Sequence, residues 1–432
     1  MPSDVLAHFS TLCAIPHCSF DTEAMRAHLV QEAKACGASV RVDKAGNILA
    51  QKGSPKVCLQ AHYDMVCMGS APRILLQEEA GYLCAKGSSL GADNGMGVAM
   101  MLSLLHTQDH LECLFTNNEE VGLLGANGLE MQIQSPCLLN LDSEEEGKVF
   151  VGCAGGVDII GTCSPEFTKA PAGWALYEIC VSGLRGGHSG IQIHENIPNA
   201  IVLLVHALAE QECALVHLEG GERINSIPTA ARAVVMMPKP FTCKEPFFTC
   251  KALAQRCEKV VANSDTILKT LCAFSQGVRG WDVALAIPSQ SINLSLLSFS
   301  EGSLRVEFFA RAMSTEGLDA LKKETKALLE LGGFSVAFKD ETLPWNPHIG
   351  PFALLVKEEA AAVWGKAEFA GIHAGLECGV LLSKHDAPLE VCSLGPQIEA
   401  PHTVKERCLV ASVHRVVEIV ERIVTRKTYG TD

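Results

Sequence analysis

The segment that most constrains the fold is residues 57–64, with the sequence Val-Cys-Leu-Gln-Ala-His-Tyr-Asp. It is largely apolar and ends in a histidine and an aspartate two positions apart. Side chains of a strand alternate between its two faces, so His62 and Asp64 are expected to point the same way. An imidazole beside a carboxylate at a buried strand end is a common way to orient a metal ligand. An ordinary strand end on the surface would carry the same two residues.

Strands and helices alternate on both sides of this segment. Helices are predicted at 22–36, 96–106, 352–364 and 405–427, and further strands at 111–116, 137–141 and 389–393. Strands that alternate with helices predict an α/β fold, in which helices flank both faces of a mostly parallel central sheet.

The pattern changes near Gly173 and returns after the break at Pro344-Trp-Asn-Pro. Between them, residues 174–182 alternate like a strand with one wet face, and helices are predicted at 196–210 and 315–331. We therefore predict a first domain made of residues 1–172 and 347–432, with an α+β domain of residues 173–346 inserted into it.

Composition and charge exclude several classes of protein. With 432 residues, 48% hydrophobic and 19% charged, the chain is long enough for two packed domains. Its net charge of −14 and the lack of a basic run argue against a nucleic-acid partner. The longest apolar span, 200–209, is too short to cross a bilayer, and the N-terminus does not resemble a signal peptide. The nineteen cysteines include no Cys-x-x-Cys, so we expect reduced thiols in a cytoplasmic protein without membrane contact.

Acidic residues and a histidine follow the predicted strands at the edge where ligands of open parallel sheets bind. Two carboxylates about 4 Å apart repel by ~4 kcal/mol at an effective dielectric constant of 20. Five carboxylates gathered there would therefore need cations, and two divalent ions come close to balancing them. Each acid alone could instead cap a neighbouring helix. The residues concerned are His62, Asp64, Asp93, Glu119, Glu120 and Asp142.

The residue types narrow the choice of metal. Histidine with carboxylates, and no thiolate, suits zinc, cobalt or manganese, whereas calcium and magnesium would take oxygen ligands alone. His402, in Glu399-Ala-Pro-His-Thr, lies in the loop before the last helix and could return a second imidazole to this site.

Six ordered motifs resemble one known family from nearly end to end. They are Gln60-Ala-His-Tyr-Asp-Met, Leu90-Gly-Ala-Asp-Asn-Gly, Asn118-Glu-Glu-Val-Gly, Asn140-Leu-Asp-Ser-Glu-Glu-Glu, Gly186-Gly-His-Ser-Gly and His373-Ala-Gly-Leu-Glu-Cys-Gly. They resemble the aminoacyl-histidine dipeptidases, which are carnosinase-like Xaa-His dipeptidases of the co-catalytic zinc metallopeptidase superfamily. The resemblance implies a zinc-peptidase-like catalytic domain and a lid domain. It leaves the oligomeric state undecided, with a homodimer as one option.

The resemblance also assigns roles to the acidic residues and histidines of the catalytic domain. Asp93 would bridge two metal ions. His62 and Asp142 would complete the site of one ion, and Glu120 and His402 the site of the other. The family further implies a cis peptide bond between Asp93 and Asn94.

The resemblance implies that Asp64 orients His62 and that Glu119 is the general base. On the lid, His188 would reach the substrate carbonyl, and Asn225 and Arg311 would hold the substrate carboxylate. Alternatively, these residues have no functional role: His188 is then a loop residue, Asn225 a turn residue and Arg311 a surface charge on a strand. Gly375 and Glu377 would line the substrate pocket, whereas four histidines are expected to be structural: His17, His194, His348 and His373.

The predicted activity is hydrolysis of short unblocked dipeptides of the Xaa-His type by a metal-bridging water. Glu119 would take the proton from this water and deliver it to the leaving amine. Within the same superfamily, a deacylase of N-acyl amino acids or a carboxypeptidase is the alternative. A non-catalytic metal-binding scaffold would be expected to have lost a ligand or the base, and none is missing.

Overall fold

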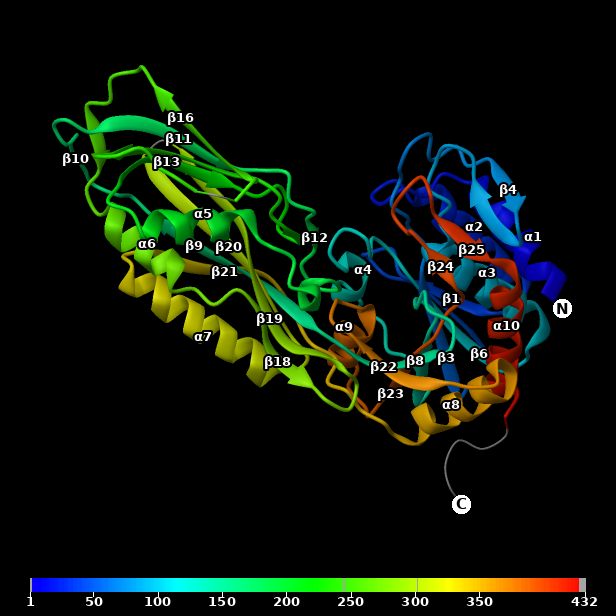
Figure 1. Cartoon of the computed structure of the whole chain (residues 1–432). Coiled ribbons are helices and arrows are strands. Elements are labelled where there is room, and N and C mark those ends of the chain that lie inside the picture. Colours follow the sequence, from blue (N-terminus) through cyan, green and yellow to red (C-terminus); the bar gives the residue numbers. More distant parts are fainter. Residues whose placement is uncertain (1, 244, 301, 427–432) are drawn as a thin grey trace. The chain divides into compact units, whose positions relative to one another are not determined.

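The computed structural model describes residues 2–243, 245–300 and 302–426, and the chain divides into two compact units (Figure 1). Unit 1 comprises Met1–Cys153, Trp345–Gly371 and Leu376–Asp432, and unit 2 comprises Ala154–Pro344 and Ile372–Gly375. Unit 2 begins earlier than the predicted residue 173. The reason is that β9 (Gly155–Cys163) pairs with β20 (Ser303–Ala312) in the sheet of unit 2, before the pattern changes near Gly173.

An eight-stranded sheet with strand order β1-β2-β6-β3-β7-β23-β8-β22 forms the centre of unit 1. Strands β6, β3, β7 and β23 run parallel, whereas β1, β2 and β8 pair antiparallel with their neighbours. All residues of β3, β6 and β7 are buried, which is the pattern expected of parallel strands covered on both faces. The strands are β1 (Ser39–Val42), β2 (Ile48–Lys52), β3 (Val57–His62), β6 (Leu111–Thr116), β7 (Cys137–Asn140), β8 (Lys148–Cys153), β22 (Glu368–Ile372) and β23 (Glu390–Ser393).

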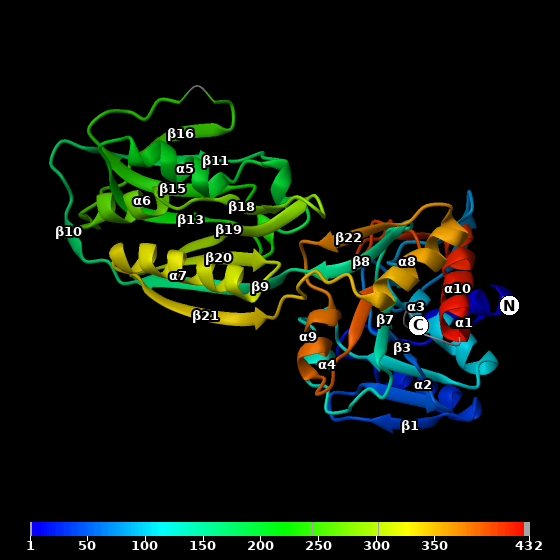
Figure 2. The same cartoon turned by 90° about the horizontal axis from the view of Figure 1, so that it is seen from below.

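Helices cover both faces of this sheet, as the alternating pattern predicts (Figure 2). On one face α2, α3, α10 and α8 contact one another in that order, and α1 packs on α3. The short helices α4 and α9 contact each other, and α9 packs on β23 and β8. The bounds are α1 (Pro2–Cys13), α2 (Glu23–Ala35), α3 (Ala92–Thr107), α4 (Leu124–Asn127), α8 (Pro351–Trp364), α9 (Glu377–Lys384) and α10 (Val410–Thr425).

The last helix starts later than the predicted residue 405, and its predicted end, residue 427, lies outside the described residues. The residues before it form β25 (Arg407–Leu409), which pairs with β5 (Tyr82–Ala85) and β24 (Ile398–Glu399). Together with β4 (Leu76–Glu79) they make a four-stranded antiparallel sheet. Pairing with a segment more than 300 residues away therefore overrides the local helical pattern at this point.

Unit 2 is built on a nine-stranded sheet with strand order β16-β11-β15-β13-β19-β20-β9-β21, to which β18 is added by pairing with β19. Helices α5, α6 and α7 share one apolar core with this sheet. Helix α5 begins later than predicted because Asn199 caps it, accepting hydrogen bonds from the amides of Ile201 and Val202. The elements are β10 (Phe167–Lys169), β11 (Ala175–Val181), β12 (Gly187–His188), η1 (Ile193–Glu195), α5 (Ala200–Ala209), β13 (Ala214–Gly220), β14 (Ser226–Ile227), β15 (Ala231–Met237), β16 (Phe248–Leu253), β17 (Lys259–Val261), α6 (Ser264–Cys272), β18 (Gly277–Asp282), β19 (Ile287–Ser300), α7 (Thr315–Leu331) and β21 (Ser335–Thr342).

The prediction that all thiols are reduced is wrong for one pair. Cys18 and Cys67 form a disulfide, with Cα atoms 5.5 Å apart and 49 residues of sequence separation. The bridge closes a segment in which the amide of Met65 donates to the carbonyl of His17 and the amide of Ser19 donates to the carbonyl of Met65. Among the described residues, no helix has the length and apolar character needed to span a membrane.

Candidate metal centre

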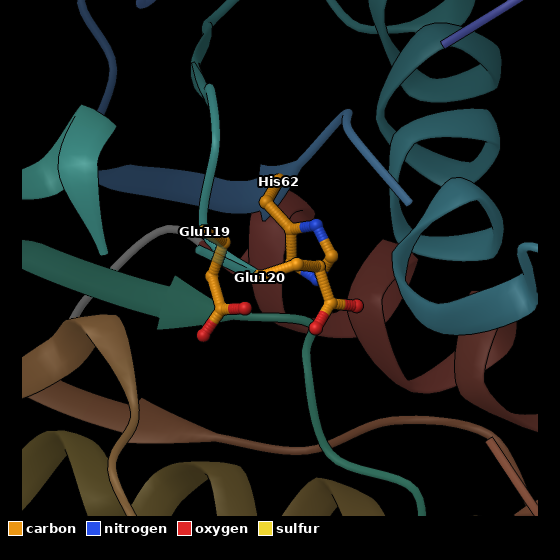
Figure 3. A group of neighbouring side chains, drawn as sticks. All are labelled: His62, Glu119 and Glu120. Carbon is orange, nitrogen blue, oxygen red and sulfur yellow. The ribbon is translucent and has the colours of Figure 1, made fainter. Parts of the chain in front are cut away.

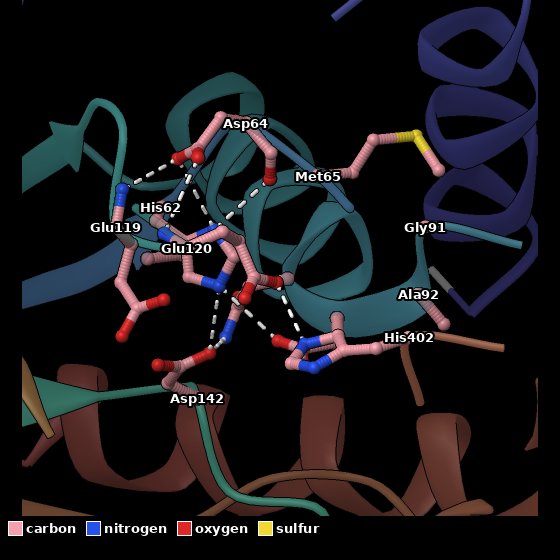
Figure 4. A network of polar contacts seen from close by, with 12 residues as sticks. His62, Asp64, Met65, Gly91, Ala92, Glu119, Glu120, Asp142 and His402 are labelled. Carbon is pink, nitrogen blue, oxygen red and sulfur yellow. Dashed lines mark hydrogen bonds and ion pairs between the residues drawn. The ribbon is translucent and has the colours of Figure 1, made fainter. Parts of the chain in front are cut away.

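The ends of three parallel strands and one helix start bring the predicted ligands of unit 1 together (Figure 4). Strand β3 ends at His62, Glu119 and Glu120 follow β6, and Asp142 follows β7. Helix α3 carries Asp93 in its first turn, and His402 comes from the loop between β24 and β25. Because β3, β6 and β7 are parallel neighbours, their carboxyl ends share one edge of the sheet.

The two carboxylate oxygens of Asp93 face two different imidazoles. Asp93 Oδ1 lies 3.1 Å from Nε2 of His62, and Oδ2 lies 3.0 Å from Nε2 of His402. Asp142 Oδ1 is 3.3 Å from Nε2 of His62. Glu120 Oε1 is 2.8 Å from Nε2 of His402. The arrangement therefore consists of two ligand groups that share one carboxylate.

These distances fit a pair of metal ions. In each group, His62 with Asp93 and Asp142, and His402 with Asp93 and Glu120, the ligand atoms all lie within 4.8 Å of one another. Atoms bound tetrahedrally at the usual zinc–ligand lengths are about 3.3 Å apart, close to the separations found. A nitrogen and oxygen donor set without thiolate suits zinc, cobalt or manganese.

Two oxygens of Asp64, the main-chain carbonyl and a carboxylate oxygen, lie near the imidazole of His62. Nδ1 of His62 lies 3.0 Å from the main-chain carbonyl of Asp64, whereas the nearer carboxylate oxygen is 3.5 Å away. Donation from Nδ1 to this carbonyl would leave Nε2 as the nitrogen able to coordinate a metal ion. The carboxylate of Asp64 mainly holds other groups: it accepts hydrogen bonds from the amides of Glu119 (2.9 Å) and Glu120 (3.4 Å) and from the hydroxyl of Ser19 (2.8 Å).

Glu119 lies beside the two groups that contain Asp93. It approaches His62 together with Glu120, and Figure 3 shows these three side chains. Burial raises the pKa of the Glu119 carboxyl, and the neighbouring charges of Asp142 and Glu120 add to the rise. A carboxyl group with a raised pKa next to a metal centre suits proton transfer near neutral pH.

The electrostatics of the cluster favour bound cations. Burial raises the pKa of the Glu120 and Asp142 carboxyls. Burial alone would lower the pKa of His402, but its hydrogen bonds to Asp93 and Glu120 outweigh this effect and bring its pKa to about 11. Without metal ions, protons would have to balance the negative charge of these carboxylates. Divalent cations would take the place of those protons.

Two neighbours of the ligands were missed as site residues by the sequence analysis. Burial, with the charges of Asp93 and Asp142, raises the pKa of the Glu144 carboxyl to about 9. Asn94 donates from Nδ2 to the carbonyl of Leu141 (3.0 Å) and to Asp142 Oδ1. The peptide bond between Asp93 and Asn94 is cis, as the resemblance implies. Glu144 and Asn94 both lie in motifs quoted above, within two positions of a predicted ligand. This closeness in sequence could have identified them as site residues.

In unit 2 the backbone fixes the hydrogen position on His188. Its Nδ1 accepts hydrogen bonds from the amides of Gly190 (3.1 Å) and Ile191 (3.0 Å). The hydrogen of the neutral ring therefore resides on Nε2, which makes that atom a donor. Strands β12 and β14 pair His188 with Ser226, and the carbonyl of Asn225 accepts from the amide of Ser189. Asn225 is thus adjacent to His188, with its side chain exposed.

Arg311 is a buried cation in the same unit. Only 6% of it is exposed, and its guanidinium stacks on the ring of Phe309 at 4.2 Å. Within the part of the chain that the structure describes, Nε of Arg311 has no hydrogen-bond partner. A side chain added at Gly190 would come within 3.0 Å of this guanidinium, so Arg311 lies directly against the His188 loop. A surface charge on a strand would be exposed and solvated, which Arg311 is not.

Gly375 and Glu377 belong to different units. Space is open around Gly375, where an added Cβ would meet no atom within 4 Å. Glu377 is fully buried, and its Oε2 accepts from Gln60 Nε2 and Thr116 Oγ1, both at 2.6 Å. Burial raises the pKa of Glu377 to about 7. Its Oε1 has no hydrogen-bond partner among the described residues.

Comparison with known proteins defines the class. Residues 58–426 match the sequence model of peptidase family M20/M25/M40, and the chain belongs to this family. It is 31% identical over 459 residues to the cytosol non-specific dipeptidase of Escherichia coli K12, covering 94% of this chain and 93% of that protein.

Solved structures show the same fold. The aminoacylhistidine dipeptidase of Vibrio alginolyticus has a TM-score of 0.85 and 28% identity, covering 99% of this chain and 98% of that one. Human carnosine dipeptidase 1 has a TM-score of 0.55 and 13% identity, covering 98% and 96%. The resemblance to the aminoacyl-histidine dipeptidases and the predicted fold class are therefore confirmed.

Proposed function

We propose that this peptidase is a cytoplasmic, dinuclear metallo-dipeptidase that cleaves short dipeptides with free termini, including those of the Xaa-His type. The observation that carries the proposal is the Asp93 carboxylate, whose two oxygens face the imidazoles of His62 and His402. The names of the E. coli and Vibrio relatives support a dipeptidase, and the E. coli name supports the cytosol.

The residues that would hold the two ions are His62, Asp93, Glu120, Asp142 and His402. Two bound divalent ions, zinc or alternatively cobalt or manganese, would polarise the scissile carbonyl and lower the pKa of the attacking water. Glu119 would take the proton from this water and return it to the leaving amine, because neither group around Asp93 needs its carboxylate. Asp64 would keep Glu119 in place through its amide.

Unit 2 would supply the groups that bind the oxyanion and the substrate carboxylate. Because the hydrogen of His188 resides on Nε2, this atom can donate to an oxyanion. Arg311 is buried and its Nε has no hydrogen-bond partner among the described residues, so its guanidinium suits the carboxylate of a dipeptide. Asn225, adjacent to His188, would add a second contact to the substrate.

A further group would bind the substrate amine. Glu377 keeps one carboxylate oxygen without a partner among the described residues, and its charge helps to raise the pKa of Glu119. We propose that Glu377 binds the amine and that Gly375, where an added Cβ would meet no atom within 4 Å, also lines the substrate site. A site that binds the free amine rejects an acetylated N-terminus, because acetylation removes the charge and adds bulk.

The test combines metal analysis with a substrate panel of Xaa-His dipeptides, other dipeptides, their N-acetylated forms and their C-terminal amides. We expect two divalent ions per chain, cleavage of the free dipeptides, and loss of cleavage after chelation that is restored by added metal. Cleavage of N-acetylated substrates in preference to free ones would instead identify a deacylase or carboxypeptidase. Turnover that survives complete removal of metal would refute the proposal.

A further inference from the structure

Glu406 is a buried carboxylate to which the sequence analysis assigned no role. Only 2% of it is exposed, and it accepts hydrogen bonds from four consecutive backbone amides. Its Oε2 accepts from Leu90 (2.8 Å) and Gly91 (3.0 Å), and its Oε1 accepts from Ala92 (2.7 Å) and Asp93 (3.3 Å). Two of these amides, those of Ala92 and Asp93, are the first of helix α3 and therefore have no hydrogen-bond acceptor within the helix.

The position of Glu406 in the chain gives this contact its importance. Glu406 lies four residues after His402, in the same connection between β24 and β25. Its carboxylate therefore ties the loop that carries His402 to the turn that carries Asp93, across more than 300 residues of sequence. Nε2 of His402 lies 3.0 Å from Oδ2 of Asp93 across the same junction.

From this geometry we infer that Glu406 is a positioning residue for the metal site formed by Asp93, Glu120 and His402. It would hold two ligands from distant segments at coordinating separation without touching the metal. The inference rests on the proposed metal centre and adds to it a requirement that lies outside the ligand set. Groups that orient metal ligands typically change metal affinity by about 10–100-fold when they are removed.

A purely structural role is the competing explanation, and the chain offers a matched control. Glu112 is fully buried and likewise accepts hydrogen bonds from backbone amides, those of Gln134 (2.9 Å) and Ser135 (2.9 Å). It lies near the start of β6, at the opposite end of the strand from the loop with the ligands. Replacement of either glutamate by glutamine removes a buried charge bound to amides, but only Glu406 is connected to the metal centre.

The experiment compares wild type, Glu406→Gln and Glu112→Gln as full-length chains by metal titration with Zn²⁺ against a competing chelator and by thermal unfolding. We expect both variants to lose thermal stability. Only Glu406→Gln should bind one of its two Zn²⁺ equivalents about 10–100-fold more weakly, with turnover recovering when zinc is raised. Glu406→Asp, which keeps the charge but is shorter by one methylene, should lie between wild type and Glu406→Gln, and it serves as the test if the glutamine variant does not fold.

Two results would overturn the inference. One is wild-type affinity for both equivalents in Glu406→Gln, and the other is an equal loss of affinity in Glu112→Gln. A wild-type chain that binds fewer than two Zn²⁺ ions would refute the proposed function itself. Two equivalents in wild type with unchanged affinity in Glu406→Gln would refute the role of Glu406 alone.

Discussion

The hydrogen bonds between the carboxylate of Asp64 and the segment that carries Glu119 can be tested quantitatively with the substitution Asp64→Asn. Asp64 is 1% exposed and accepts from the amides of Glu119 and Glu120 and from the hydroxyl of Ser19. In the variant, the remaining amide oxygen can still accept from Glu119. The new NH₂ group would then face the amide of Glu120, while the hydroxyl of Ser19 can rotate to accept.

These changes leave one buried amide unsatisfied, at a cost of about 1–3 kcal/mol, and weaken the remaining charge-assisted bonds. We expect a loss of about 2–3 kcal/mol in the stability of unit 1, which corresponds to a fall of about 4–12 °C in its melting temperature. The carbonyl of Asp64 stays in place, so His62 keeps its orientation. Displacement of Glu119 by about 1 Å should nevertheless lower turnover by roughly 10²-fold.

The assay is thermal unfolding together with turnover of a dipeptide at saturating metal. Ser19→Ala is the control, because it removes one donor to Asp64 and leaves the carboxylate and both backbone hydrogen bonds. Its losses of stability and turnover should be the smaller. Turnover at the wild-type level in Asp64→Asn would show that the carboxylate does not position the base.

Three further predictions follow from single features. Glu119→Gln should keep both metals and lose about 10²–10⁴-fold in turnover, as seen by metal analysis beside kinetics; loss of a metal would mean that the two adjacent glutamates have exchanged roles. Arg311→Ala should lower kcat/KM for free dipeptides by roughly 30- to 5,000-fold, which corresponds to a loss of about 2–5 kcal/mol in transition-state binding, and an equal loss for dipeptide amides would show that Arg311 does not bind the carboxylate. Reduction of the Cys18–Cys67 disulfide, which closes a loop with 49 residues of separation, should cost up to about 4 kcal/mol of stability; an unchanged melting temperature after reduction would contradict this.

The sheet edge of unit 1 could be predicted because local patterns determine it. The apolar runs that end at His62, Thr116 and Asn140 each identify a strand, and parallel pairing brings their ends to one edge. The five proposed ligands and the candidate base follow from that edge and from the motif resemblance.

Features that depend on distant pairing could not be predicted. The cysteines at 18 and 67 have no recognisable spacing, and their proximity follows from the path of the chain around Met65. Nothing in the sequence separates Glu406 from a surface glutamate, because its partners are backbone amides far away in the chain. The start of unit 2 was placed too late because β9 joins that unit only through pairing with the later strands β20 and β21.

The central claim is that two divalent ions share the carboxylate of Asp93, and metal stoichiometry measured in wild type and in Asp93→Asn tests it most directly. We predict two equivalents of Zn²⁺ or Co²⁺ per wild-type chain, with dipeptide hydrolysis rising as both bind. In Asp93→Asn both equivalents should weaken together, because one side chain serves both ligand groups. Loss of only one equivalent in Asp93→Asn, or full hydrolysis by metal-free wild type, would contradict the account.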